Sequence, residues 1–255
     1  MRFEDLDARL RVFETAHDQW VLPGVFIVVR LDGRGFTRLT KEVWDLEAPF
    51  DPRFRDAMLT TTEHLVNCGL SVVYGYTQSD EISLLLHRDA ENFGRKMRKI
   101  ISVLAGETSA CFTHTFGRMA CFDARISQLT SATLVRDYFD WRQEDAHRNA
   151  LSAHCYWLLR KAGKSAQAAD SELLGLSGSQ KNEFLFQKGI NFNDLPMWQK
   201  RGCAVHWEDY LKQAVNPKTG EAVQAARRRL VRNLELPMGA SYAEFVDGFV
   251  AQASA

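Results

Sequence analysis

Two aspartates that follow apolar segments are the residues of this 255-residue chain best suited to hold a divalent cation. Asp32 ends the segment 25–32, which opens with five β-branched or aromatic residues and predicts a strand buried on both faces. Asp80 lies between two further β-rich runs. Two carboxylates and a backbone carbonyl, here that of Gly33, are the hard oxygen ligands that Mg²⁺ prefers. The pattern therefore predicts a metal site of Asp32, Gly33 and Asp80; the alternative is two turns that contact only solvent.

Such a site suits phosphoryl or nucleotidyl transfer. Two metal ions about 3.5–4 Å apart activate the attacking oxygen and stabilise the leaving oxygen in these reactions. A triphosphate also needs cationic side chains around it. Glu81 follows Asp80 directly, so on a strand it should point to the opposite face, and we assign it a structural role. The cationic candidates nearest to the aspartates in the expected topology are Arg30, Arg34, Lys96, Lys99 and Arg125.

The predicted elements bring the two aspartates together. A strand over 25–31 is followed by a helix over 54–68, two strands over 71–77 and 82–87, a helix over 92–111 and a strand over 118–126. Arg95, Lys96 and Lys99 are expected on the outer side of the helix over 92–111. This order is the split β-α-β pattern of ferredoxin-like sheets, in an α+β fold. The first and third of these strands are the central pair of such a sheet. Asp32 and Asp80 should therefore face each other.

The rest of the chain predicts additions to this core. Apolar residues at helical spacing predict an amphipathic helix over 3–13, and residues 133–161 predict a long helix. A short helix around 181–186, a second hairpin with its turn at Asn216-Pro-Lys-Thr-Gly220, and a terminal helix follow. We divide the chain into a catalytic core over 1–130 and a helical and hairpin extension over 131–255, packed together as one unit.

Composition narrows the class of protein. Lys plus Arg and Asp plus Glu balance at 32 each, so only a local basic patch could bind nucleic acid. The five cysteines are scattered and form no C-x-x-C pair, which argues against zinc and disulfides. The polar N-terminus and the lack of a membrane-length apolar run predict a cytoplasmic protein.

Five ordered segments resemble the histidine-tRNA guanylyltransferase family, the reverse (3′-to-5′) RNA polymerases. The resemblance covers about residues 5–212, and five motifs in order are more specific than any single one. The segments are Arg30-Leu-Asp-Gly-Arg-Gly-Phe36, Tyr74-Gly-Tyr-Thr-Gln-Ser-Asp-Glu81, Asp137-Tyr-Phe-Asp-Trp-Arg-Gln143, Lys181-Asn-Glu183 and Ile190-Asn-Phe-Asn-Asp-Leu-Pro-Met197.

The resemblance implies a polymerase-like palm with two Mg²⁺ ions, held by Asp32, the Gly33 carbonyl and Asp80, with Ser79 beside them. In the family, ATP or GTP activates the 5′-monophosphate of a tRNA, and a nucleoside triphosphate then extends the 5′ end. Homotetramers are implied as well. Matching positions for nucleotide and phosphate binding are Gly33, Arg34, Gly35, Phe36, Thr37, Lys96, Lys99, Arg125, Lys181 and Asn191. Those for RNA or the activation step are Arg30, His147, Asn149 and Asn182.

Two departures from the family pattern favour its bacterial and archaeal guanylyltransferase-like branch. Enzymes specialised for histidine tRNA carry His-Ile-Asn-Asn, where this chain has His147-Arg-Asn-Ala150. Glu47-Ala48 stand before Pro49, where the family commonly has a lysine, and Lys41 is the candidate to replace it. The branch repairs truncated tRNA 5′ ends by template-directed addition, so we expect that activity.

Three alternatives stay open. One is untemplated addition of a single guanosine to histidine tRNA. Another is a different two-metal palm enzyme, such as a nucleotidyl cyclase or a forward polymerase. The last is a non-catalytic RNA-binding module, which needs exposed aromatic residues on its central strands. The segment 25–29 is aliphatic apart from Phe26, which argues against that module. For His147, the alternative to a role in RNA binding or activation is a purely structural role, as is common for a single histidine on a helix.

Overall fold

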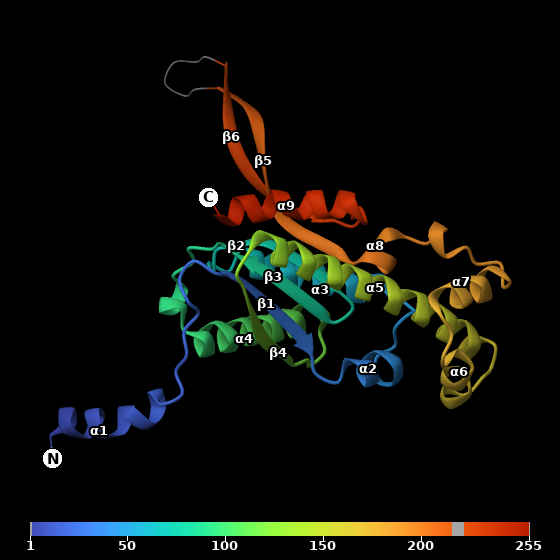
Figure 1. Cartoon of the computed structure of the whole chain (residues 1–255), viewed down its shortest axis with the longest axis horizontal. Helices are drawn as coiled ribbons and strands as arrows, with labels where there is room; N and C mark the ends of the chain where they lie inside the picture. Colours follow the sequence, from blue (N-terminus) through green and yellow to red (C-terminus); the bar gives the residue numbers. More distant parts are fainter. Residues whose placement is uncertain (1, 216–221, 255) are drawn as a thin grey trace.

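A computed structural model describes residues 2–215 and 222–254, and its centre is one six-stranded antiparallel sheet (Figure 1). The strand order is β4-β1-β3-β2-β5-β6. The strands are β1 (Phe26–Gly33), β2 (Val72–Gln78), β3 (Glu81–Leu86), β4 (Phe122–Leu129), β5 (Cys203–Val215) and β6 (Ala222–Asn233).

The first four strands confirm the predicted ferredoxin-like palm. Helix α3 (Pro52–Val66) joins β1 to β2, and helix α4 (Met97–Phe116) joins β3 to β4. β3 lies between β1 and β2, which is the split arrangement that the sequence predicts. The register pairs Asp32 with Glu81 on β3 and with Asp123 on β4. Asp32 therefore lies at the end of a central strand, between two neighbours.

The two faces of the sheet are covered by different helices. Alternate residues of β1, such as Ile27 and Val29, pack into the core beneath α3 and α4. Asp51 caps α3 by accepting a hydrogen bond from the Arg53 backbone nitrogen, and Pro52 occupies its first turn. The other face, with Val28, lies against helices α5 (Ala132–Lys161) and α9 (Ala240–Ser254). Arg30 and Asp32 continue along this second face.

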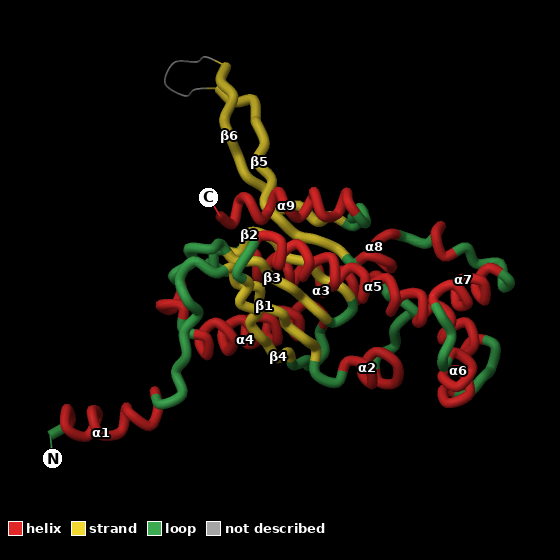
Figure 2. The backbone as a smooth tube through the Cα atoms, viewed as in Figure 1, coloured by secondary structure: helices red, strands yellow, loops and turns green. Residues whose placement is uncertain are grey.

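The extension is built around the 30-residue helix α5, which the sequence predicts almost to its ends. The predicted second hairpin is also present as β5 and β6, and Figure 2 shows it leaving the body of the protein. Its predicted turn, 216–220, lies outside the described residues. Helix α7 (Gly178–Phe186) matches the predicted short helix, whereas α6 (Ala166–Leu173), α8 (Met197–Arg201) and the 3-10 turn η3 (Phe192–Asp194) have no counterpart in the prediction.

The N-terminal helix and its surroundings show one confirmed and one wrong prediction. Helix α1 (Phe3–Thr15) forms as predicted, but none of its residues is buried. Residues 92–95 are a separate 3-10 turn, η2, with positive φ at Phe93 and Arg95, so the predicted single helix from residue 92 is wrong. Arg95 is buried and donates to the carbonyl oxygens of Val21 and Ala90, instead of lying on the outer side.

Two short segments complete the chain, α2 (Phe36–Arg38) and the π-helical turn η1 (Leu39–Val43), directly after β1. Within the described ranges, no helix has the length and apolar character needed to cross a membrane. The division at residue 130/131 stays a prediction.

Candidate active site

The end of β1 holds Asp32 between two arginines. Arg30 Nη2 donates to Asp32 Oδ2 at 2.9 Å, and Arg125 Nη2 lies 3.6 Å from the same oxygen. Both arginines share the face of Asp32 because Arg30 is two residues earlier on β1 and pairs with Arg125 across to β4. Within the described part of the chain, both arginines contact only the Oδ2 atom of Asp32. Oδ1 therefore remains for a further ligand.

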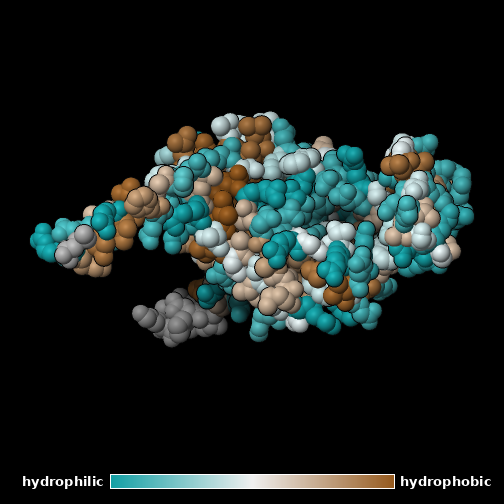
Figure 3. All heavy atoms as spheres, turned by 90° about the horizontal axis from the view of Figure 1, so that it is seen from below, coloured by the Kyte–Doolittle hydropathy of each residue, from teal (hydrophilic) through white to brown (hydrophobic). Residues whose placement is uncertain are grey.

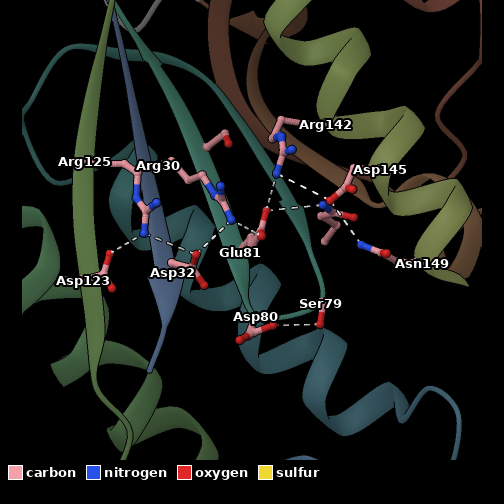
Figure 4. Close-up of polar contacts among 12 residues, drawn as sticks. Arg30, Asp32, Ser79, Asp80, Glu81, Asp123, Arg125, Arg142, Asp145 and Asn149 are labelled. Atoms are coloured by element: carbon pink, nitrogen blue, oxygen red, sulfur yellow. Dashed lines mark hydrogen bonds and ion pairs between the residues drawn. The ribbon is translucent and has the colours of Figure 1, made fainter. Parts of the chain in front are cut away.

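Asp80 lies in a tight turn beside that strand end. β2 and β3 pair up to Gln78 and Glu81, so Ser79 and Asp80 are the two connecting residues, and Ser79 has a φ of 47°. The Gly33 backbone nitrogen donates to the Asp80 carbonyl oxygen at 3.1 Å. Figure 4 shows Asp32 and Asp80 at the same end of the adjoining strands. The structure thus brings together the two aspartates that the sequence singles out.

The Asp80 carboxyl lies in an unfavourable environment for its negative charge. Burial is the main cause, and with the charges of Asp32 and Glu81 it raises the pKa of Asp80 to about 6, although the Ser79 hydroxyl donates to Oδ1 at 2.9 Å. Excess negative potential of this kind favours a bound cation. No group of three or more His, Cys, Asp or Glu side chains placed to hold a metal occurs among the described residues. A metal here would rely on two carboxylates and backbone oxygen, which is a donor set that fits Mg²⁺.

Gly33 is required by its close approach to Phe36. A Cβ atom at residue 33 would lie 2.4 Å from the Phe36 ring. That ring is buried among Trp44, Phe112 and Phe122 and has no room to move. Phe36, which the resemblance places at the nucleotide, belongs to this aromatic core and also lines the cavity beside Asp80. The core fixes the loop that follows Asp32.

A row of charges runs across the sheet from Asp32 to α5 (Figure 4). Arg30 donates to Glu81 as well as to Asp32, and Arg142 of α5 donates from Nη1 to Glu81 Oε2 at 3.0 Å. Arg142 is almost completely buried and also lies 3.6 Å from Asp145. Glu81 shares the face of Asp32 because the two are register partners. The prediction that Glu81 points to the opposite face is therefore wrong, because Asp80 lies in the turn and not on the strand. Its contacts hold it between two guanidinium groups, as expected of a structural residue.

A cavity of about 470 Å³ opens beside the turn at Asp80, and we call it the palm cavity. Its wall includes Thr37 of α2, Ser79 and Asp80 of the turn, the loop 46–51, and one face of α5. That face carries Ala146, Asn149, Ala150, Ala153 and Trp157, which recur at helical spacing. Lys41, the candidate to replace the missing lysine, also lines the palm cavity, and its ammonium lies over the Tyr156 ring.

A second cavity of about 400 Å³ lies between α5, α7 and η3, and we call it the α7 cavity. It collects three residues expected to contact RNA or nucleotide, namely His147, Asn182 and Asn191. Burial lowers the pKa of the His147 imidazole, whose Nδ1 atom is buried without a hydrogen-bond partner. Asn191 caps η3 by accepting from the Asn193 nitrogen. Lys181 lies nearby on α7, and its ammonium donates to the Ser152 hydroxyl at 3.0 Å.

Lys96 and Lys99 do not lie with the other site residues. Lys96 precedes α4, pairs with Trp20 in an isolated bridge and lies 2.9 Å from Asp18. The C-terminal part of α4 approaches the aspartates, because Phe112 contacts Phe36 in the loop after Asp32. At 1.5 Å per residue, both lysines are about 20 Å or more from that end. The expectation that they lie nearest to the aspartates in this topology is wrong within a single chain.

Two further residues of the site were missed or undervalued. Arg142 lies in the segment 137–143 that carries the family resemblance, yet its sequence position gives no sign that it reaches Glu81. Asp123 pairs with Asp32 and lies 3.2 Å from Arg125. The alternation of strand residues could have placed Asp123 beside Asp32 once the order of the strands was known. Arg34 and Gly35 are exposed at the start of the loop, with Gly35 at a φ of 74°.

The palm fold, the paired aspartates and the adjoining cavity are typical of nucleotidyltransferases. Comparison with known proteins gives the family. The family model described as tRNAHis guanylyltransferase matches residues 7–130, and the model of the Thg1 C terminal domain matches residues 133–238. The chain therefore belongs to the tRNA(His) guanylyltransferase family.

Individual relatives agree with this assignment. The tRNA(His) guanylyltransferase of Debaryomyces hansenii is 30% identical over 232 residues, which is 86% of this chain and 87% of that protein. A bacterial tRNA(His) guanylyltransferase (Thg1)-like protein in complex with ATP has 28% identity and a TM-score of 0.74, with 96% of this chain and 99% of that chain covered. A complex with GTP, also described as a bacterial Thg1-like protein, has 27% identity and a TM-score of 0.72, with the same shares covered.

Proposed function

We propose that this chain adds nucleotides in the 3′-to-5′ direction to the 5′ end of tRNA, under the direction of a template. The observation that carries the proposal is the meeting of Asp32 and Asp80 beside the palm cavity. A cavity of about 470 Å³ is of a size that binds small organic ligands such as nucleotides. The names of the relatives support the tRNA substrate, and the ATP and GTP complexes of similar proteins support both nucleotides.

The residues that line the palm cavity or lie beside it at the end of β1 have distinct tasks in this reaction. Asp32, the Gly33 carbonyl and Asp80 would hold two Mg²⁺ ions, which supply activation of the attacking oxygen and neutralisation of phosphate charge. Arg125 and the exposed Arg34 bind phosphate oxygens, and Ser79 orients Asp80 by its hydrogen bond. Gly35 and Thr37 lie at the start of α2, where the backbone can approach the nucleotide. Arg30 holds Asp32 and Glu81 in position.

The α7 cavity binds part of the tRNA in this proposal. His147, Asn182 and Asn191 supply neutral hydrogen-bonding groups there, and Lys181 supplies a charge behind them. Asn149 lies on the palm side of α5, where it can contact the activated 5′ end. Lys96 and Lys99 could contact a triphosphate only in another subunit of the expected homotetramer. A cytoplasmic location, where tRNA is processed, belongs to the same proposal.

Templated repair is favoured over addition of a single guanosine by the residues on α5. Ala150 replaces the second asparagine of the His-Ile-Asn-Asn pattern, and it is buried in the wall of the palm cavity. An apolar side chain at position 150 lacks the hydrogen-bonding group that the second asparagine would offer to a guanosine. Base pairing with the opposite strand then decides which nucleotide is added. Untemplated guanosine addition, which the family name favours, is the second candidate.

The decisive experiment uses a tRNA transcript that lacks its first nucleotide and carries a 5′-monophosphate. With Mg²⁺, ATP and all four nucleoside triphosphates, we expect extension by the wild-type protein and none by Asp32→Ala. Asp170→Ala, an exposed aspartate on α6, is the matched control and should extend the transcript normally. No extension by the wild type, or equal extension by Asp32→Ala, contradicts the proposal.

A change of the templating base then separates the two candidates. If the added nucleotide follows the opposite base, the enzyme repairs by template. If guanosine is added regardless of that base, the enzyme adds guanosine without a template and the repair assignment is wrong.

A further inference from the structure

Helix α1 presents an apolar stripe that the described chain leaves uncovered. Four apolar side chains at spacings of three, four and three residues form this stripe, which we call the seam: Phe3, Leu6, Leu10 and Phe13. No residue of α1 is buried, and Phe13 is 77% exposed. Figure 1 shows α1 projecting from the body, and Figure 3 shows hydrophobic side chains along it. An isolated helix shorter than about 12–15 residues is marginal in water, so α1 needs a packing partner.

The base of α1 is fixed to the body and carries more apolar surface. The Asp18 side chain is buried between Lys96 and Arg98, which ties the segment after α1 to the start of α4. Trp20 and Leu22 follow, and both are exposed. Together with the exposed Phe93 of η2 they form what we call the root patch. All residues of the seam and the root patch except Phe93 lie within residues 3–22.

The surface area of the chain is larger than that of a compact monomer. The structure exposes 14506 Å², whereas a compact chain of this mass exposes about 11,400 Å². The excess is several times the roughly 800 Å² that each partner buries in an interface of standard size. Helix α1 and the β5–β6 hairpin are the elements that project (Figure 2). The molecule therefore has area to bury on association.

Spacings of three, four and three place the seam at the a and d positions of a coiled coil. The residues beside the seam are then Arg2 and Arg9 on one flank and Asp7 and Glu14 on the other. In a parallel pair, each flanking residue faces the opposite flank of its partner five residues later, so Arg9 meets Glu14. In an antiparallel pair, like charges would meet. Within the described residues, neither Arg9 nor Glu14 has an ion pair in its own chain.

From the seam, its flanking charges and the excess area, we propose that α1 packs in parallel along α1 of a second copy of this chain. A parallel pair places both helix roots at one end, so the root patches of the two copies meet beside the two-fold axis. The same surface then serves both subunits, as two-fold symmetry requires. The proposal concerns assembly and does not depend on the proposed reaction.

The first test is the mass of the full-length protein in solution. Sedimentation equilibrium of the double variant Leu10→Ser/Phe13→Ser should give half the wild-type mass. Val12→Ser is the matched control, because Val12 is 62% exposed but lies on the side of α1 away from the seam, and it should keep the wild-type mass. The Tm of the wild type should rise with protein concentration, whereas the Tm of the seam variants should not depend on it, because only the wild type is stabilised by association. A monomeric wild type, or a seam variant with unchanged mass, overturns the proposal.

A cross-linking test examines the orientation. In a parallel pair, residue 10 faces residue 10 of the partner, so Leu10→Cys should form a disulfide-linked dimer on mild oxidation. Ala8→Cys, on the opposite side of the helix, and the wild type should remain uncrosslinked. Arg9→Glu should weaken the dimer and Arg9→Glu/Glu14→Arg should restore it. If α1 folds onto its own palm or contacts RNA instead, no Leu10 cross-link forms, and that result overturns the pairing.

Discussion

The palm cavity and the α7 cavity lie on different sides of the same helix, and the chemistry of their walls differs. The palm cavity is bounded by carboxylates at the end of a rigid sheet, with Asp80 in a turn where Ser79 has a positive φ. The α7 cavity is bounded mainly by asparagines and a histidine whose pKa is lowered by burial, with Glu183 as its one carboxylate, and no lysine or arginine occurs among its described lining residues.

Under the proposed function, the palm cavity carries out the reaction and the α7 cavity recognises the tRNA. Carboxylates that are close together and buried repel each other, and a cation relieves that repulsion. Such a site therefore serves phosphate chemistry. Amide groups and an unpartnered imidazole nitrogen offer neutral donors and acceptors, which suit the edges of bases. Substitutions in the palm cavity should thus abolish the reaction, and substitutions in the α7 cavity should weaken tRNA binding.

The largest effect is expected from Asp80→Ala. Loss of groups that only orient a metal ligand costs 10–100-fold in activity, so loss of a ligand should cost more than about 100-fold in nucleotide addition. The dissociation constant for tRNA, measured by filter binding without Mg²⁺, should stay within about threefold of wild type. A large loss of tRNA binding in this variant would mean that the two cavities do not divide the work in this way.

Arg142→Met should come next. The substitution leaves Glu81 with one guanidinium partner instead of two, and breaking a buried ion pair costs about 3–5 kcal/mol of unfolding free energy. We expect about a 10–100-fold loss of activity, because Arg30 and Asp32 shift with Glu81. Chemical denaturation measures the first effect, and the rate of nucleotide addition to the tRNA transcript measures the second.

Arg136→Met provides the control for Arg142→Met. Arg136 is on the same helix, and its contact with Asp247 is partly exposed, so the change should cost less than about 1 kcal/mol. Equal effects of the two substitutions would show that the row of charges has no special importance.

The raised pKa of Asp80 gives a prediction for pH. The folded protein holds this proton up to about pH 6, whereas the unfolded chain releases it near 3.8. Unfolding free energy without metal should therefore fall as the pH rises from about 4 to about 6. Asp80→Asn should remove this decrease, and Mg²⁺ should raise the wild-type Tm more at pH 7 than at pH 5. An identical pH slope in Asp80→Asn would contradict the assignment.

The smallest effect is expected from Asn182→Ala in the α7 cavity. The loss of one neutral hydrogen bond is worth about 0.5–1.5 kcal/mol, so KM for tRNA should rise about 2- to 12-fold while kcat stays constant. Asn67→Ala, an exposed residue just after α3, serves as control and should change neither constant. A fall in kcat with unchanged KM would assign the α7 cavity to the reaction itself.

The strongest periodic patterns predicted the fold well. The apolar run of β1, the helical spacing in α5 and the two hairpins all match the structure, because each of these elements buries a continuous face. The meeting of Asp32 and Asp80 followed from the order of the elements alone. Strand order fixes which strand ends are neighbours, so the sequence was sufficient for that part of the site.

The predictions that failed all depended on tertiary contacts, which the sequence pattern does not reveal. Arg95 was placed outside because charged residues usually face water, yet five backbone carbonyls compensate its burial: Val21, Leu22, Val25, Arg88 and Ala90. Lys96 and Lys99 were assigned to the site from the helix that carries them, without knowledge of which end approaches Asp32. The α7 cavity depends on short elements such as η3, whose positions are set by tertiary contacts.

The long helix α5 has a consequence for how the two cavities work together. His147 lines one cavity and Asn149 the other, and residues two apart on a helix point about 200° away from each other. A ligand that displaces α5 to enlarge one cavity must narrow the other. Binding at the two sites is then antagonistic, and each ligand lowers the affinity for the other by the same factor, because one coupling free energy describes both effects. Under the proposed function, helix α5 could therefore couple tRNA binding in the α7 cavity to nucleotide binding in the palm cavity.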